Sequence, residues 1–367
     1  MNIFKQLKIN IIKIIYGLAK DHNIYINDIL FSYLTIKLTH KQLYGEICTN
    51  AALVFAKAFS YTEKQIGQLI VERLKYTNYI ETTNLASRGF INITLKAFIW
   101  TKAINNILLQ PHNTYTENTK NKQEITLECN VIHAALLKGY NRGLIFVNAL
   151  NALFIKSGYK VTKQYLQGSN YLNSTVTIYK SNIHTLDVIN ISNHIIYDNN
   201  LNYISLNDII LTFFSKKHTL PLKIQTRQIY EQSKSNIIFC IKYTYNLVCY
   251  ILEHAKNNTL VDYIGKLCID CNHYTQDDLE LIKLLALWPQ ILEDIITSYE
   301  IHQIALYLQK LSMYFYNTQH KESNKNLPFI YNNDINLTVT RLALIRAIKV
   351  VIESGFDIIG IKLVVKN

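Results

Sequence analysis

The chain has 367 residues, of which 49% are hydrophobic and 17% are charged. This length corresponds to two or three domains with buried cores, and the low content of glycine (11), proline (4) and cysteine (6) excludes a collagen-like, low-complexity or disulfide-stapled protein. Lys and Arg (38) outnumber Asp and Glu (26), and the net charge of +12 favours a polyanionic partner, nucleic acid first and anionic lipid second.

The basic residues are mostly lysine, since only six of the 38 are arginine. Lysine acts as a point charge and does not form the bidentate pairs with which arginine reads bases. The composition therefore favours broad attraction to phosphates over dense reading of base edges.

Three sequence features bear on the compartment. No run of 18 or more uncharged apolar residues occurs, so we expect no membrane-spanning segment and no membrane partner. The basic stretch 1–20 lacks the Arg and Ser of a transit peptide and is interpreted as the first helix. The six cysteines lie mostly among apolar residues, which favours a reducing environment, and we expect a cytoplasmic protein.

Residues 1–110 have the pattern of a compact α+β module. Apolar residues at helical spacing predict a first helix around Ile11, Ile15 and Leu18, and a second helix is expected over 50–59. A third helix is predicted from Thr62, because Thr62-Glu63-Lys64-Gln65 has the form of a capping box. Residues 89–95 alternate as a strand does, and the polar stretch 112–123 is typical of a linker.

The rest of the chain changes from mixed to helical. Residues 124–215 contain strand-like runs at 174–179 and 185–191 and a helix predicted over 143–156. From about 225 onward the pattern is helical, with a second capping box at 275–278 and Pro289 expected to kink or end a helix. Two apolar stripes are predicted to face the core. The first consists of Ile304, Leu308, Leu311 and Phe315, and the second consists of Leu342, Ile345, Ile348 and Ile352. On the helix that carries the second stripe, Arg346, Lys349 and Glu353 are predicted to lie on the solvent face. The predicted fold class is α+β, mostly helical.

Four segments, in chain order, resemble arginyl-tRNA synthetases. Gly45–Leu53 is similar to the G-D-x-x-T-N-x-A-L stretch of that family's N-terminal domain, and Gly89-Phe90-Ile91-Asn92 matches its G-F-I-N strand. Lys223–Ala255, which contains Glu231-Gln232-Ser233-Lys234, resembles the first helix of the anticodon-binding domain, and Arg341–Gly360 is similar to the helix that names the D-A-L-R domain. The collinear order of the segments is what makes the resemblance specific.

The resemblance implies three domains. Residues 1–110 would form the D-loop-binding domain, residues 111–222 a reduced remnant of the Rossmann-like catalytic domain, and residues 223–367 the anticodon-binding helical bundle of DALR type. Between 170 and 191 there is room for only a few strands, so most of the family's arginine pocket is expected to be absent.

The resemblance fails at both ATP-binding signatures. The family's H-x-G-H falls on Leu137, Lys138, Gly139 and Tyr140, counted back from Gly158-Tyr159-Lys160-Val161-Thr162, and His133 lies four residues upstream of the first lost position. A lone histidine of this kind is more often structural than a replacement ligand. The K-M-S-K-R-like loop falls on residues without its cations: Ile195, Ile196, Tyr197, Asp198 and Asn199. The family uses ATP and arginine with magnesium. We expect none of these cofactors here, because the preorganised phosphate-binding groups that supply most of such catalysis are missing from both signatures.

Phe90 and Asn92 are the leading candidates for RNA recognition. Alternation places them on one strand face, where a ring can stack on a splayed base while an amide reads the edge of the base. The resemblance implies that this pair contacts a D-loop base of tRNA, and the alternative is that Phe90 caps the small core while Asn92 bonds a turn. Further RNA contacts are predicted at Asn50, Arg88, Arg142, Lys242, Tyr243, Tyr316, Asn317, Arg346 and Lys349.

No metal or acid–base site is predicted. Cys268, Cys271 and His273 supply only half of a zinc site's spacing. No sequence pattern brings together any two of the carboxylates Asp187, Glu128 and Asp198, so they are not predicted to form an acid–base pair.

The favoured hypothesis is a truncated paralogue of arginyl-tRNA synthetase that binds tRNA or a tRNA-like RNA without charging it. A second hypothesis is a divergent arginine–tRNA ligase, active alone or with a protein partner that supplies the lost pocket. A third is a structural subunit that reuses the fold for protein contacts.

Overall fold

The computed structural model describes residues 2–39, 45–109, 124–131, 141–167, 173–180, 183–197, 204–257, 274–321 and 335–362. The chain divides into two compact units, of which the first contains residues 2–104 and the second contains the described residues from 105 onward.

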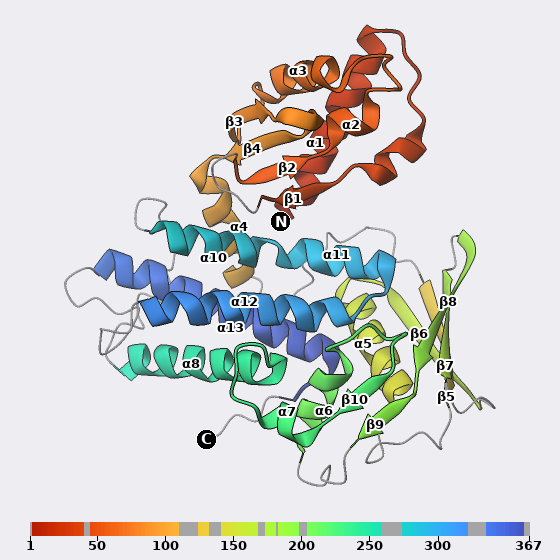
Figure 1. The fold of residues 1–367 in the computed structure, drawn as a ribbon, viewed down its shortest axis with the longest axis vertical. Coiled ribbons are helices and arrows are strands. Elements are labelled where there is room, and N and C mark those ends of the chain that lie inside the picture. The colour runs from red at the N-terminus through yellow and green to blue at the C-terminus, as the bar shows by residue number, and fades with distance from the viewer. Residues whose placement is uncertain are drawn as a thin grey trace. The chain divides into compact units, whose positions relative to one another are not determined.

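The first unit is a four-stranded antiparallel sheet with helices against one face (Figure 1). The strand order is β1-β2-β4-β3. Its elements, with α4 following them, are α1 (Ile3–Asp21), η1 (Asp28–Tyr33), β1 (Ile36–Leu38), β2 (Ile47–Thr49), α2 (Ala51–Phe55), α3 (Glu63–Leu74), β3 (Ile80–Leu85), η3 (Ser87–Gly89), β4 (Ile91–Leu95) and α4 (Ala97–Leu109).

Local sequence signals account for most of these elements. The capping box at the start of α3 is formed as predicted: Thr62 accepts from the backbone N–H of Gln65, and the Gln65 side chain accepts from the N–H of Thr62. Ile11 and Ile15 of α1 are fully buried. The helix expected over 50–59 is shorter than predicted, because α2 ends at Phe55 and the chain turns back at Ser60, which has a positive φ of 53°.

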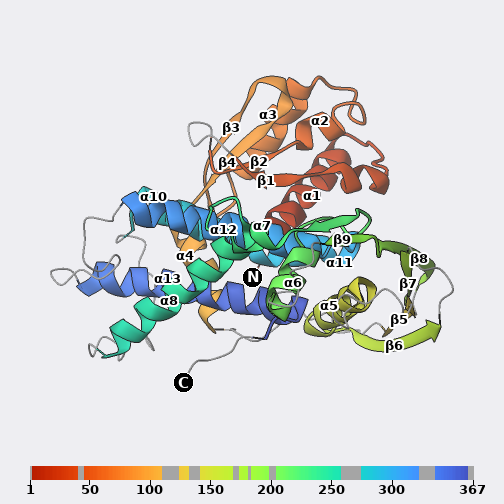
Figure 2. The ribbon, with the colours of Figure 1, turned by 60° about the horizontal axis from the view of Figure 1, so that its bottom comes forward.

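The second unit begins with a mixed sheet. The strand order is β6-β5-β7-β8, in which β5 and β6 are parallel and the other pairs are antiparallel. Helix α5 makes the crossover between the two parallel strands and packs against one face of the sheet (Figure 2). The elements are β5 (Glu124–Val131), α5 (Arg142–Lys156), β6 (Lys160–Gln167), β7 (Asn173–Lys180) and β8 (Ile183–Ser192). The helix predicted over 143–156 and the strands predicted at 174–179 and 185–191 are thereby confirmed.

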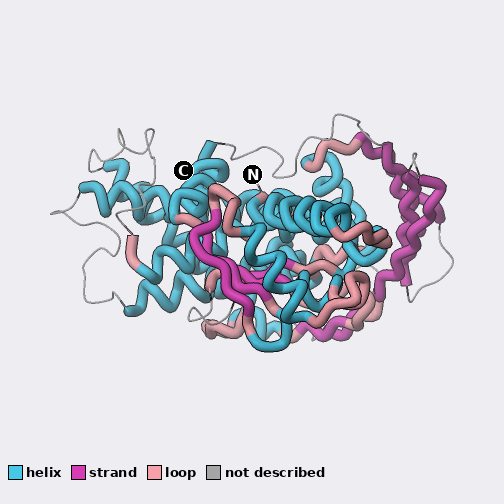
Figure 3. Tube along the Cα trace, turned by 90° about the horizontal axis from the view of Figure 1, so that it is seen from above, coloured by secondary structure: helices cyan, strands magenta, loops and turns pink. Residues whose placement is uncertain are grey.

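A short parallel ribbon follows the sheet. Strand β9 (Ile195–Tyr197) pairs with β10 (Leu222–Ile224), and helix α6 (Leu206–Phe213) lies between them in sequence. The polypeptide then enters a set of helices, which Figure 3 distinguishes in cyan from the magenta strands: α7 (Thr226–Tyr230), α8 (Ile237–Asn257), α10 (Gln276–Ala286), α11 (Trp288–Ser298), α12 (His302–Lys321) and α13 (Ile335–Ile359).

The helical part confirms the predicted fold class, α+β and mostly helical. Both predicted apolar stripes, on α12 and α13, are buried in full. Pro289 stands in the first turn of α11, where its missing N–H costs nothing, so the apolar pattern is divided into α10 and α11.

Helix α13 is more deeply buried than its pattern predicts. In residues 341–356 the three predicted solvent-facing residues, Arg346, Lys349 and Glu353, are the ones that are not buried, and each is only half-exposed. The first arginine of the D-A-L-R-like segment, Arg341, is 4% exposed and its Nε lies 3.3 Å from a carboxylate oxygen of Asp278. Asp278 also completes the capping box with Thr275, so this ion pair ties α13 to the start of α10.

None of the helices in the described parts of the chain has the length and apolarity needed to cross a bilayer. Cys48, Cys129, Cys240 and Cys249 are free thiols. Cys268, Cys271 and His273, the predicted half of a zinc site, lie outside the described residues.

Candidate nucleic-acid interface

A row of polar side chains crosses the sheet of the first unit. The strand register places Lys37 of β1 beside Cys48 of β2, Cys48 beside Asn92 of β4, and Asn92 beside Asn84 of β3. Their neighbours along the strands, Ile47, Ile91 and Ile93, are fully buried under the helices, so alternation turns the polar row to the opposite face. This face is the candidate surface of the first unit.

Phe90 lies at the end of β4 on the same face as Asn92. Its ring is 39% exposed, which leaves it available for stacking and argues against the alternative that it caps the core. Asn92 is 8% exposed, so its amide is less accessible than the sequence pattern implies. The chain enters Phe90 through Arg88 and Gly89, which both have positive φ, and a Cβ at Gly89 would lie 2.8 Å from Glu63 Cβ. The turn that carries Phe90 is therefore held in one place.

The two other candidates of the first unit differ from each other. Arg88 is exposed, within the same turn as Gly89. Asn50 instead bonds the backbone: its Oδ1 accepts from the N–H of Thr35 at 2.8 Å and its Nδ2 donates to the carbonyl of Tyr33 at 3.0 Å. Asn50 thus holds the segment before β1 against the start of α2, and its amide is already engaged.

Arg142 lies inside the second unit, which corrects its prediction as an RNA contact. It is 3% exposed, and five backbone carbonyl oxygens lie 2.6–3.4 Å from its two terminal nitrogens. Four of these carbonyls belong to the turn 213–220 that follows α6, and the fifth belongs to Ser192 at the end of β8. Burial lowers the pKa of Arg142 to about 10, so the guanidinium still carries its charge at neutral pH. Its function in this fold is to fix the turn.

The position of the second ATP-binding signature is occupied in part by a strand. Ile195, Ile196 and Tyr197 form β9, and their backbones pair with Leu222, Lys223 and Ile224 of β10. The remaining positions of both signatures, and His133, lie outside the described residues: Leu137, Lys138, Gly139, Tyr140, Asp198 and Asn199.

The acidic residues considered at the sequence level have structural partners. Asp187 accepts hydrogen bonds from the hydroxyl of Tyr299 at 2.6 Å and from Lys180 at 3.4 Å, and these bonds lower the pKa of Asp187. The Tyr179 hydroxyl donates to Glu128 at 3.5 Å. Each of these two carboxylates therefore already accepts a hydrogen bond from a tyrosine hydroxyl, and the lowered pKa of Asp187 is the opposite of what a general acid needs.

Three predicted RNA contacts, Tyr243, Tyr316 and Asn317, come together on neighbouring helices. The rings of Tyr243 on α8 and Tyr316 on α12 lie 5.2 Å apart, and Phe239 stacks on Tyr243 at 5.7 Å. Lys234 lies 4.9 Å above the Tyr316 ring and donates to Asn317 Oδ1 at 3.1 Å. We call these five residues the aromatic cluster. Its three aromatic rings are half-exposed and lie beside an exposed cation, the combination that binds single-stranded bases and their phosphates.

Lys234 was not predicted as a contact, although it lies in the Glu231–Lys234 segment that carries the family resemblance. It is 82 positions from Tyr316 in the sequence, so no spacing rule could have paired them.

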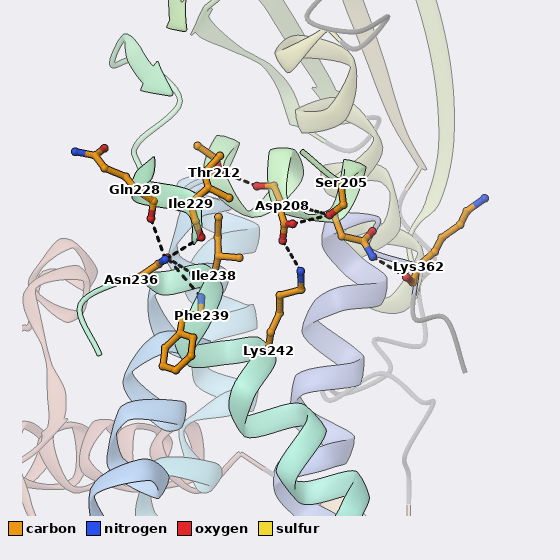
Figure 4. A network of polar contacts seen from close by, with 11 residues as sticks. Ser205, Asp208, Thr212, Gln228, Ile229, Asn236, Ile238, Phe239, Lys242 and Lys362 are labelled. Atoms are coloured by element: carbon orange, nitrogen blue, oxygen red, sulfur yellow. Dashed lines mark hydrogen bonds and ion pairs between the residues drawn. The ribbon is translucent and has the colours of Figure 1, made fainter. Parts of the chain in front are cut away.

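Lys242 and Lys349 are bound within the protein. Lys242 Nζ lies 2.7 Å from Asp208 Oδ1, and Ser205 and Thr212 complete a network that fastens α8 to α6 (Figure 4). Lys349 is half-exposed and lies 3.6 Å from Glu353, one turn along α13. Both predicted RNA contacts thus have a carboxylate partner within the chain, and each stays partly exposed. Arg346 is half-exposed on the same helix as Lys349.

The folds of solved arginyl-tRNA synthetases superpose on this one. The enzyme from Thermus thermophilus matches with a TM-score of 0.67 and 8% identity, over 98% of this chain and 99% of that one. The enzyme from Plasmodium falciparum matches with a TM-score of 0.67 and 10% identity, over 99% of each chain. These likenesses establish the class of fold.

Sequence comparison extends the likeness to the family. Residues 2–95 match the arginyl-tRNA synthetase N-terminal domain, and residues 241–366 match the DALR anticodon-binding domain. The chain belongs to the arginyl-tRNA synthetase family through these two domains, which together span more than half of it.

The similar sequences are arginine–tRNA ligases of which this chain matches only part. The ligase of Orientia tsutsugamushi (strain Boryong) is 36% identical over 159 residues, 41% of this chain and 27% of the relative. The ligase of Bartonella henselae is 34% identical over 151 residues, 40% of this chain and 26% of the relative. The matched region thus spans about a quarter of the length of these curated relatives.

Proposed function

We propose that this protein binds tRNA, or an RNA with the loops of tRNA, through the polar row with Phe90 and through the aromatic cluster. The observation that carries the proposal is the cluster itself, because it brings Tyr243, Tyr316 and Asn317 of the DALR domain together with Lys234, which lies just before that domain in the sequence. The net charge of +12 supplies the long-range attraction that such binding needs. The three-domain division at 110 and 222 is part of the same proposal.

We further propose that the chain does not form arginyl-adenylate. The second ATP signature falls on the apolar strand Ile195–Tyr197, whose backbone is committed to β10 and whose side chains offer no cation to a pyrophosphate leaving group. Removal of one preorganised donor typically lowers a rate by about 10²–10³, and here a whole set is replaced.

Two measurements on the full chain test the proposal. RNA affinity should fall linearly with log salt, with a slope of about −0.7 for each phosphate neutralised on a single strand. Arginine-dependent exchange of pyrophosphate into ATP should remain at the level of a no-enzyme blank. Exchange above the blank would establish a divergent ligase, and repeating the assay with added cell extract from the source organism tests whether a partner subunit restores it. Absence of RNA binding at low salt would leave the structural-subunit hypothesis.

A further inference from the structure

A groove opens beside the aromatic cluster, between the end of α6, strand β10, α7 and the start of α8. It has a volume of about 290 Å³, at the lower end of the range for small-ligand sites. We call it the α6–α8 groove, and the lining residues that matter here are Lys216, Lys223, Gln225, Gln228, Ser235 and Ile238.

The chemistry of the groove suits an anionic, partly apolar ligand. Two lysines and two glutamines line it together with the buried side chains of Ile224, Ile229 and Ile238. Glu231 is the one carboxylate among the lining residues that the structure describes. Lysines offer charge to a phosphate, and glutamine amides offer both donors and acceptors to a sugar or base.

The walls of the groove are held in place by hydrogen bonds between side chains and the backbone. Asn236 donates to the carbonyls of Gln228, Ile229 and Glu231 at 2.7–3.0 Å and accepts from the N–H groups of Ile238 and Phe239 (Figure 4). The opposite wall is the turn after α6 that Arg142 fixes, and that turn includes Lys216. A site whose backbone is fastened in this way loses little conformational entropy on binding.

The groove adjoins the aromatic cluster. Ser235 lines the groove and Lys234, the next residue, covers Tyr316. Gln309 of α12 donates to the carbonyl of Ser235 at 3.0 Å, which fixes this junction to the helix that carries Tyr316 and Asn317. A positively charged groove leading onto aromatic rings is the arrangement that follows a single-stranded backbone while bases stack alongside.

We propose that the α6–α8 groove holds the ribose-phosphate of one nucleotide in a single-stranded RNA loop, whose neighbouring bases stack on Tyr243 and Tyr316. This inference rests on the proposed RNA binding and adds to it a second contact site in the same unit. It assigns Lys216 and Lys223 to phosphate, and Gln225 and Gln228 to the sugar or base.

Isosteric charge substitutions test the groove with little change in packing. Gln228→Glu places a carboxylate in the groove, and Gln164→Glu makes the same change in net charge on the exposed strand β6. The probe is a hairpin RNA with a single-stranded loop, compared with a fully paired duplex of equal length. We expect Gln228→Glu to weaken hairpin binding by at least about tenfold, because a unit charge a few ångströms from a phosphate is repelled more strongly near a protein surface than in bulk water. Duplex binding, and hairpin binding by Gln164→Glu, should change less than about twofold on the same reasoning.

A second pair of variants measures the phosphate contacts. Lys216→Gln with Lys223→Gln should lower the salt slope for the hairpin by about 1.4, whereas Lys163→Gln with Lys310→Gln should leave it nearly unchanged. Melting temperatures recorded for every variant identify losses of affinity that come from unfolding. If Gln228→Glu is destabilised, the salt slope of the variant that lacks Lys216 and Lys223 decides whether the groove binds phosphate.

The outcomes separate this inference from the proposed function. If Gln228→Glu and Gln164→Glu bind the hairpin alike while Tyr316→Ala weakens it, the groove is overturned and RNA binding stands. If inorganic phosphate or a mononucleotide saturates the groove in a Gln228-dependent manner without competing with the hairpin, the groove is a small-anion site and the inference is wrong. If the unmodified protein binds no RNA, the proposed function itself fails.

Discussion

The surroundings of Arg142 and the aromatic cluster use positive charge in opposite ways. The guanidinium of Arg142 donates hydrogen bonds to backbone carbonyls in the interior. Its charge also contributes to lowering the pKa values of His218 and His302 nearby. Lys234 is exposed, and its ammonium lies over a tyrosine ring at the surface. In a chain with a net charge of +12, a basic residue is thus not by itself a sign of an RNA contact. Burial and the partners of each cation decide its role.

The largest effect is expected from removal of Arg142. Arg142→Ala should lower the free energy of unfolding by about 3–5 kcal/mol, because buried carbonyls lose a charged donor and a cavity remains. Arg142→Lys should recover only part of the loss, since one ammonium cannot reach carbonyls on both sides of the planar fork. Urea unfolding of the variants measures this. A loss of less than about 1 kcal/mol would place Arg142 in the same class as a surface cation.

The same interior should make stability depend on pH. Burial lowers the pKa of His218 to about 4, against 6.5 for a free side chain, so the folded state binds fewer protons than the unfolded state. The stabilisation is therefore complete above pH 6.5 and is lost as the pH falls toward 4, by about 3 kcal/mol in total. Lys217 and Arg142 oppose the protonation, whereas Glu300 favours it.

His218→Phe isolates this contribution, because it retains a ring against Phe146, whose centroid lies 4.8 Å away. We expect the variant to lose the steep part of the dependence between pH 6.5 and 4 in unfolding free energies measured at a series of pH values. An unchanged pH profile would show that folding does not lower the pKa of His218.

At the surface, substitutions should alter RNA affinity more than stability. Tyr316→Ala should lose about 1–3 kcal/mol of binding, the usual contribution of one base–aromatic stack. Tyr250→Ala is the matched control, since Tyr250 is 59% exposed on α8 and lies outside the aromatic cluster. Equal losses in the two variants, measured by titration of labelled tRNA, would remove the cluster from the binding site.

The first unit should contribute a more selective effect. Phe90→Ala should lose about 1–3 kcal/mol of affinity, the usual contribution of one base–aromatic stack, since Phe90 is 39% exposed. Asn92→Ala should relax discrimination among D-loop bases more than it lowers affinity. Melting temperatures distinguish a stacking role from a core role. A Phe90→Ala protein that keeps both its melting temperature and its affinity would confine recognition to the second unit.

The sequence by itself determined several of the helices and strands and their order along the chain. The capping boxes at Thr62 and Thr275, the stripes of α12 and α13, and the alternation of β7 are local signals, since each depends on residues within one or two turns or strand repeats. The family resemblance added the identity of the two end domains, because its motifs are short and collinear.

Tertiary structure alone decided which cations and rings are available. Arg142 stands at the start of a helix, as an anion-binding residue would, yet β8 and the turn after α6 enclose it with carbonyls. Lys234 and Tyr316 meet only because α8 packs on α12, and the α6–α8 groove exists only where four separate elements converge. Spacing reveals which face of an element is apolar, but it carries no information about what another element places against that face.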